Sequence, residues 1–191
     1  HRKQAKTYIE LAAEMLAEFA GWFPERSFNL SADGAYASLA GHDLPRTRFT
    51  SRIRSDAAIY DLPSPRRKGQ RGATPKKGAR LPTPKQIAEQ TTSGWQTANF
   101  DRRGKTLQRL SLSRVVLWYK TSKTRPFLLT IVRDPAGKEP DDFFFTTDLS
   151  VDPAQIASDY AGRWSIEDTF RDVKQLLGGE DPQCWKGQGP A

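Results

Sequence analysis

The chain of 191 residues is poor in the features that mark disulfide-stabilised and membrane-embedded proteins. It has one cysteine, Cys184, so no disulfide can form within the chain, and this usage is typical of a reducing compartment. No apolar run approaches the roughly 20 residues that a membrane-spanning helix needs. The first residues mix basic, polar and apolar side chains and do not resemble a secretory leader. These absences favour one domain of ordinary size with no membrane partner.

Acidic residues are outnumbered by basic ones, 22 against 30, which gives a formal net charge of +8 and a pI of about 9.7. This balance favours a polyanionic partner, with nucleic acid ahead of an anionic membrane surface. Much of the positive charge lies in residues 63–84, a proline- and glycine-rich segment without an acid. We predict that this basic segment is an extended, mobile loop, and we favour a DNA-phosphate-binding arm over a solvated linker. Its predicted phosphate contacts are Arg66, Arg67, Lys68, Lys76 and Lys77.

Near the C-terminus, the sequence predicts one helix from Asp152 to Leu177. Asp152 is a suitable N-cap and Pro153 suits the first helical position, while Gln155 can close a capping box. The glycine pair at residues 178–179 is suited to a left-handed helix end.

At about 100° per residue, this helix presents two neighbouring stripes. The apolar stripe is expected to pack against a core and contains Ile166, Phe170, Val173 and Leu177. The polar stripe contains Tyr160, Arg163, Glu167, Arg171 and Lys174. The simpler interpretation of the polar stripe is a solvated face with the ion pairs Arg163–Glu167 and Glu167–Arg171.

Upstream, the pattern predicts a helix at residues 4–20 and a set of strands. The apolar face of that helix, expected to pack on a sheet, contains Tyr8, Leu11, Ala12, Met15, Leu16 and Phe19. The strands are predicted at residues 27–32, 47–54, 96–102, 106–120, 125–132 and 143–147. In the second strand, Phe49, Ser51 and Ile53 share one face, and Arg48, Arg52 and Arg54 share the other.

Asp33 follows the first predicted strand, where the chain turns into a short helix. A carboxylate at the end of a strand often serves as a metal or catalytic ligand, because the strand fixes it while the loop exposes it. The alternative is that Asp33 only caps the next helix. His42 and Asp43 are interpreted as loop residues because they lack partners at metal-ligand spacing. Trp95 has two candidate roles, stacking on an unpaired base and packing on the sheet, and packing is favoured.

The pattern Tyr160-x2-Arg163-x3-Glu167-x6-Lys174, followed by Leu177-Gly178, resembles the signature of insertion-sequence DDE transposases of the insertion-sequence-four superfamily. The segment Ala32-Asp33-Gly34-Ala35-Tyr36 is similar to the surroundings of that family's second catalytic aspartate. The resemblance implies an α/β, partial RNase H-like (retroviral-integrase-like) fold with a β-rich insertion before the last catalytic helix.

By this resemblance, Asp33 and Glu167 are two of the three carboxylates that hold two Mg²⁺ or Mn²⁺ ions. The implied DNA-contacting residues are Tyr160, Arg163 and Lys174, and the neighbouring cations expected to join them are Arg171, Arg52 and Arg54. The implied partners are DNA at transposon ends and targets and, in the intact enzyme, a second copy of the protein. The implied location is the nucleoid in the bacterial cytoplasm.

The resemblance divides the chain into four parts. They are part of the RNase H-like core at 1–60, the basic loop and β-rich insertion at 61–150, the catalytic helix at 151–179 and a tail at 180–191. We expect the first strands and the first aspartate to be absent and the chain to be an inactive piece of a longer enzyme. The alternatives are a non-catalytic basic DNA-binding fragment or decayed relic and, from charge alone, an RNA-binding or membrane-surface protein.

Overall fold

The computed structural model describes residues 5–65, 72–102 and 105–176. Its helical elements are α1 (Tyr8–Trp22), the 3-10 helix η1 (Gly34–Gly41), α2 (Pro84–Gln90), α3 (Pro153–Gly162) and α4 (Trp164–Leu176). Its strands are β1 (Phe28–Ala32), β2 (Thr47–Arg52), β3 (Gln96–Arg102), β4 (Lys105–Val116), β5 (Phe127–Arg133) and β6 (Asp142–Thr146). The predicted strands are all confirmed, with ends shifted by a few residues.

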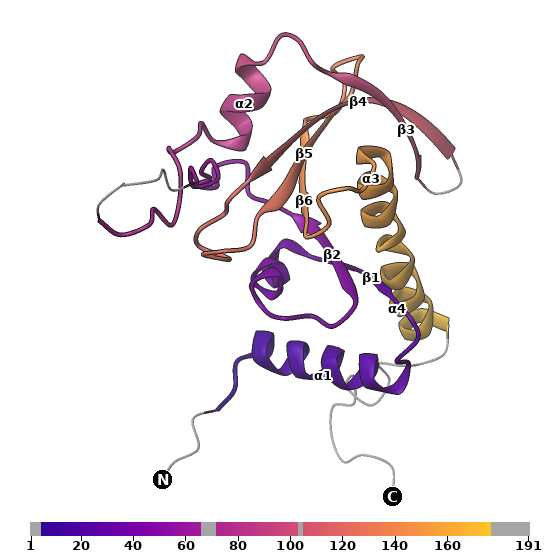
Figure 1. The fold of residues 1–191 in the computed structure, drawn as a ribbon. Coiled ribbons are helices and arrows are strands. Elements are labelled where there is room, and N and C mark those ends of the chain that lie inside the picture. The colour runs from indigo at the N-terminus through magenta and orange to yellow at the C-terminus, as the bar shows by residue number, and fades with distance from the viewer. Residues whose placement is uncertain (1–4, 66–71, 103–104, 177–191) are drawn as a thin grey trace, which may run out of the picture.

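The six strands form one mixed sheet in the order β1-β2-β6-β5-β4-β3 (Figure 1). β1 and β2 pair in parallel, and the other neighbours pair antiparallel. Because β6 pairs with β2, the sheet runs across the division that the sequence predicts at residue 60. The β-rich segment therefore extends the same sheet as β1, the strand that precedes Asp33 and lies at the opposite side of the sheet from β3.

Apolar side chains cover both faces of the sheet, so the molecule has three layers. On one face, Phe49, Phe127 and Phe145 lie in a core that also takes side chains from α1, η1 and α2. On the other face, α3 packs Ile156, Ala157 and Tyr160 against side chains of β5 and β6. Figure 1 shows α3 lying across this face and α4 continuing beyond it past β1.

The N-terminal helix forms where the sequence predicts it, starting from a capping box between Thr7 and Glu10. Its predicted burial is wrong for most of the apolar face, since Met15 is 70% exposed and Tyr8 is 59% exposed. The buried positions of α1 are Ile9 and Ala20. The reason is that α1 packs on η1 at the edge of the molecule, so only a narrow side of the helix is covered.

The prediction of one continuous C-terminal helix is also wrong, because the chain forms α3 and α4 with a turn at Arg163. Gly162 directly precedes this turn, and glycine stabilises a helix less than other residues do. Asp152 caps α3 as predicted, accepting a hydrogen bond from Ala154 N at 2.7 Å. The side chain of Gln155 instead donates to Asp159 at 2.6 Å. The predicted end at residues 177–179 lies outside the described residues.

The apolar stripe of α4 was expected to pack against a core, and this prediction is wrong. Ile166 is 52% exposed, Phe170 57% and Val173 37%. The physical reason is the position of α4, which extends beyond β1 where the sheet offers no surface to cover it (Figure 1).

Candidate active site

Asp33 lies at the carboxyl end of β1, directly before η1. Its Oδ1 accepts a hydrogen bond from Ala35 N at 3.1 Å, so the capping role is present. This bond uses one carboxylate oxygen, and the side chain remains exposed. Because β1 and β2 are parallel, their carboxyl ends meet at one edge of the sheet, where ligands commonly bind.

The residue after Asp33 lies beside the end of β2. A Cβ added at Gly34 would lie 3.6 Å from the backbone oxygen of Arg52, the last residue of β2. Beside it is a hollow of about 530 Å³, lined by parts of η1, the end of β2 and the segment after β4. Three cations line this hollow, Arg52, Arg54 and Lys120. Trp118 also lines it and packs edge-on against Phe145, with the ring centroids 5.3 Å apart.

Both arginines at the end of β2 have carboxylate partners. Arg52 forms an ion pair with Asp142, and its guanidinium lies 5.7 Å from the ring centroid of Tyr160. Arg54 binds both oxygens of Asp56 at 2.8 Å, and this hydrogen bonding raises the pKa of Arg54. A DNA phosphate in the hollow would therefore compete with these carboxylates for the arginines or share the arginines with them.

Tyr160, Arg163 and Glu167 form a contiguous group where α3 passes into α4. Tyr160 is 6% exposed, and its ring packs against Phe144. Arg163 lies over the Tyr160 ring at 5.3 Å and donates from Nη1 to Glu167 Oε1 at 2.6 Å. Burial lowers the pKa of Arg163, but its hydrogen bond to Glu167 and the neighbouring charges outweigh burial, so the net shift is upward.

Arg52 joins the two halves of the site. Its backbone lies beside Gly34, next to Asp33, while its side chain lies over Tyr160, next to Arg163 and Glu167. Arg52 thus lies between the strand end that precedes η1 and the ring of Tyr160 on α3. Sequence reasoning gave Arg52 a DNA contact, but the ring contact between strand and helix had no signal in the sequence.

The remaining predicted contacts lie on the outer parts of the molecule. Arg171 pairs with Asp168 at 3.0 Å and with Asp172 at 3.8 Å, so the predicted Glu167–Arg171 pair is replaced. Lys174 is in the last turn of α4.

In the basic segment, Lys76 is exposed and Lys77 lies 4.1 Å from the ring centroid of Tyr60 and 4.8 Å from that of Tyr119. Three predicted contacts lie outside the described residues, namely Arg66, Arg67 and Lys68. Sequence reasoning missed Lys120 in the hollow, although a lysine just beyond the end of a central strand is a signal that could have found it.

Trp95 has contacts on its ring nitrogen and on one ring face. Its Nε1 donates to Thr91 O at 2.9 Å, and the Arg133 guanidinium lies 4.2 Å from the ring centroid. The ring also packs against the larger core. These contacts fit the packing role, and base stacking by Trp95 stays a prediction.

The two predicted carboxylates are the type of ligand that a hard divalent cation prefers, but two are too few to form a complete site. Asp33 and Glu167 offer carboxylate oxygens, which Mg²⁺ prefers. Among the side chains that the structure describes, no three from His, Cys, Asp or Glu lie close enough together to hold a metal ion. Asp33 and Glu167 are therefore of the right chemical type for a metal ligand, and their role as ligands stays a prediction.

The comparisons with known proteins identify the class. The family model described as the transposase DDE domain matches residues 4–188, and the chain belongs to this family. A search of curated proteins gives no match. The mixed α/β structure, with its largely antiparallel sheet, is compatible with the RNase H-like fold of DDE enzymes. The family assignment indicates transposition by DNA cleavage and joining. None of the described helices is both long and apolar enough to span a membrane.

Proposed function

We propose that this chain carries the second and third metal-binding carboxylates, Asp33 and Glu167, of an insertion-sequence transposase with the Tyr-Arg-Glu-Lys motif. The observation that supports the proposal is the position of Arg52, whose backbone lies beside Gly34, the residue after Asp33, and whose guanidinium lies 5.7 Å from the ring centroid of Tyr160, the ring that Arg163 also covers. An isolated surface ion pair on a helix would need no such connection to a strand end. The proposed partners are DNA at transposon ends and a second copy of the enzyme, in the bacterial cytoplasm at the nucleoid.

The chemistry divides between the carboxylates and the cations. Two divalent ions, when bound, activate the attacking oxygen and stabilise the leaving oxygen of a phosphodiester. Asp33 and Glu167 supply oxygen ligands from two separate elements of the fold. Arg163, whose side chain is 14% exposed, pairs with Glu167 at 2.6 Å. Arg52, Arg54 and Lys120 bring positive charge to the hollow beside Asp33, where DNA phosphates would bind.

The same proposal includes further strands beyond β1, with the first aspartate among them. Two observations support it. Among the described residues, β1 pairs with β2 alone, and beside it lies an apolar groove of about 400 Å³, lined by α1, β1 and η1 and including Met15, Phe19 and Leu30. On α4, which runs past β1, Ile166 and Phe170 are exposed. A strand added at β1 would place apolar side chains against both surfaces.

The test is metal-dependent cleavage of transposon-end DNA by the gene product that contains this chain. Asp33→Ala and Glu167→Ala are expected to lower the cleavage rate about a thousandfold or more, because each removes several kcal/mol of barrier lowering, and to leave DNA binding in place. Asp168→Ala is the matched control, since Asp168 is the neighbouring acid and pairs with Arg171 on the surface. Cleavage that survives Glu167→Ala, or that falls equally with Asp168→Ala, would overturn the proposal.

The alternative is a basic DNA-binding fragment without catalytic activity. One observation favours it, namely that the described residues hold no cluster of three metal-binding side chains. DNA binding alone does not separate the two functions, whereas cleavage does. We expect the 191-residue chain by itself to bind DNA and not to cut it in Mg²⁺.

A further inference from the structure

Helix α4, which carries Glu167, is held in place largely through α3. The exposed apolar side chains of α4 show that little of its own surface packs on the molecule. α3, in contrast, buries Ile156, Ala157 and Tyr160 on the sheet. Apolar contact is non-directional, so it keeps α3 against the sheet without fixing how the helix is turned or how far it slides.

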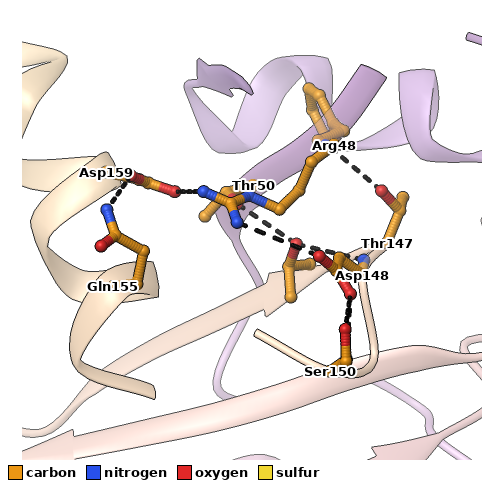
Figure 2. Close-up of polar contacts among 9 residues, drawn as sticks. Arg48, Thr50, Thr147, Asp148, Ser150, Gln155 and Asp159 are labelled. Carbon is orange, nitrogen blue, oxygen red and sulfur yellow. Dashed lines mark hydrogen bonds and ion pairs between the residues drawn. The ribbon is translucent and has the colours of Figure 1, made fainter. Parts of the chain in front are cut away.

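A polar cluster centred on Arg48 makes directional contacts that can fix the orientation of α3 on the sheet (Figure 2). Arg48 lies on β2, opposite Asn29 of the strand that leads to Asp33. Its Nη2 donates to Asp159 Oδ2 on α3 at 2.6 Å. Its Nη1 lies 3.9 Å from Asp148 Oδ2, in the connection between β6 and α3. One guanidinium thus reaches both the segment before α3 and the next-to-last turn of that helix.

The two carboxylates are themselves anchored. Asp159 Oδ1 accepts from Gln155 Nε2 at 2.6 Å, one turn earlier on α3. Asp148 accepts from the hydroxyl and backbone N–H of Ser150 at 2.7 and 2.9 Å. These bonds to Ser150, helped by the charge of Arg48, hold the pKa of Asp148 below its usual value. Both acids therefore meet Arg48 in fixed orientations.

The burial of the cluster favours a role in geometry over a role in stability. The Arg48 side chain is 19% exposed and that of Asp159 is 12% exposed, so water competes little for the ion pair. Arg48 Nε is buried and has no hydrogen-bond partner among the described residues. An arginine kept there with one donor unsatisfied gains less stability than an apolar residue could, but it fixes orientation.

We infer that Arg48 is a positioning residue that sets the direction in which α3 leaves the sheet, and with it the place of Glu167. Its guanidinium holds Asp159 and Asp148 against β2. Tyr160 follows Asp159 directly. Because α4 begins just after the turn at Arg163, the orientation of α3 also sets the position of α4. The catalytic consequence rests on the proposed function of Glu167, whereas the positioning itself does not.

The test measures the position of α4 directly. Nitroxide labels at Ser38→Cys on η1 and Gln175→Cys on α4, in a Cys184→Ser background, report the distance between the two elements by pulsed electron resonance. Arg48→Met and the isosteric Asp159→Asn are expected to bring a second distance population to on the order of a tenth of the molecules or more. Arg48→Lys keeps a positive charge near Asp159, so most molecules of this variant are expected to show the single label distance of the parent protein.

Arg109→Met is the matched control. Arg109 is 14% exposed and pairs with two acids, Asp134 and Glu139, but it lies on β4 and holds the turn between β5 and β6. Its loss is expected to weaken the fold and leave the label distance unchanged. The inference is overturned if Asp159→Asn keeps one distance population, or if Arg109→Met produces the same second population as Arg48→Met.

A second readout concerns cleavage by the gene product that contains this chain. Arg48→Met should lower the cleavage rate at saturating DNA at least tenfold while changing end-DNA affinity little, with partial rescue by Arg48→Lys. If the distances shift as expected but no cleavage depends on Glu167, the proposed function fails and the positioning role of Arg48 stands.

Discussion

The acidic side chains of this protein differ in the groups that donate hydrogen bonds to them. Asp159 accepts from Arg48 on β2, which joins two elements, and Glu167 accepts from Arg163 one helical turn before it. Asp33, Asp134 and Asp152 accept from backbone N–H groups just after them, which places them at the starts of turns and helices. Sequence alone could not separate these uses at Asp33, because a capping carboxylate and a ligand carboxylate occupy the same position after a strand.

Asp134 gives a pH prediction at this scale. It accepts from the N–H groups of Ala136, Lys138 and Glu139, and these bonds, with Arg109 nearby, lower its pKa. A lowered folded-state pKa stabilises the protein above the unfolded value of about 3.9, and this stabilisation is lost as pH falls through the folded value. Asp134→Asn should therefore be less stable than the parent at neutral pH, and the gap should close in acid.

The measurement is the urea midpoint of both proteins at a series of pH values from neutral to strongly acidic. Asp43→Asn serves as the control, because the Asp43 side chain is 98% exposed and its change should leave the midpoint unaltered throughout. Parallel midpoint curves for the parent and Asp134→Asn would show that the charge of Asp134 contributes nothing.

At the scale of elements, the sequence predicted strands better than helix packing. The alternation in residues 47–54 placed Phe49, Ser51 and Ile53 on one face, and all three side chains are buried. The helix α2 was missed because prolines dominate its surroundings, although Thr83 and Gln86 form a capping box there. The apolar stripes of α1 and α4 were expected to be covered, since periodicity shows that a face is apolar but not that a partner surface exists.

Replacing each of two glycines with alanine should change the free energy of unfolding in opposite directions. Gly162, in the last turn of α3, has no heavy atom within 4 Å of an added Cβ, so Gly162→Ala should raise the free energy of unfolding by about 0.5–1 kcal/mol. An added Cβ at Gly41 would collide with the backbone oxygen of Thr121, so Gly41→Ala should lower it. Urea unfolding of both variants checks the pair, and a destabilised Gly162→Ala would mean that the break at Arg163 depends on glycine.

For the whole molecule, charge and family could be predicted from the sequence, and the assembly of the site could not. The motif residues Tyr160, Arg163 and Glu167 do lie together, because their spacing places them on one side of successive helical turns. The link from Asp33 to this group depends on β2 pairing with both β1 and β6. Such pairing is set by long-range contacts that no local pattern contains.

The net charge of +8 gives a prediction for DNA binding by the whole chain. The affinity should fall steeply with salt, because each phosphate contact releases counterions. Neutralising Arg66, Arg67, Lys68, Lys76 and Lys77 together should reduce the slope of log K against log salt by up to about 4.5, if all five contact duplex phosphates.

The control neutralises five cations elsewhere and should change the slope far less; these are Lys6, Arg26, Lys85, Lys105 and Lys138. Equal changes in the two variants, measured by fluorescence anisotropy across a salt series, would show that the basic segment has no special part in binding.

The pairing of β2 with β6 also determines when the protein can fold during its synthesis. Thr50 and Thr146 face each other across this pair, although 96 positions separate them in the chain. β3, β4 and β5 follow one another and pair in order, so they can assemble as hairpins while the ribosome is still working. β2 must wait for β6 with its inner edge unpaired, exposed to chaperones and to other nascent chains. Joining the two halves of the sheet is therefore a late event, because it needs a strand that is synthesised long after β2.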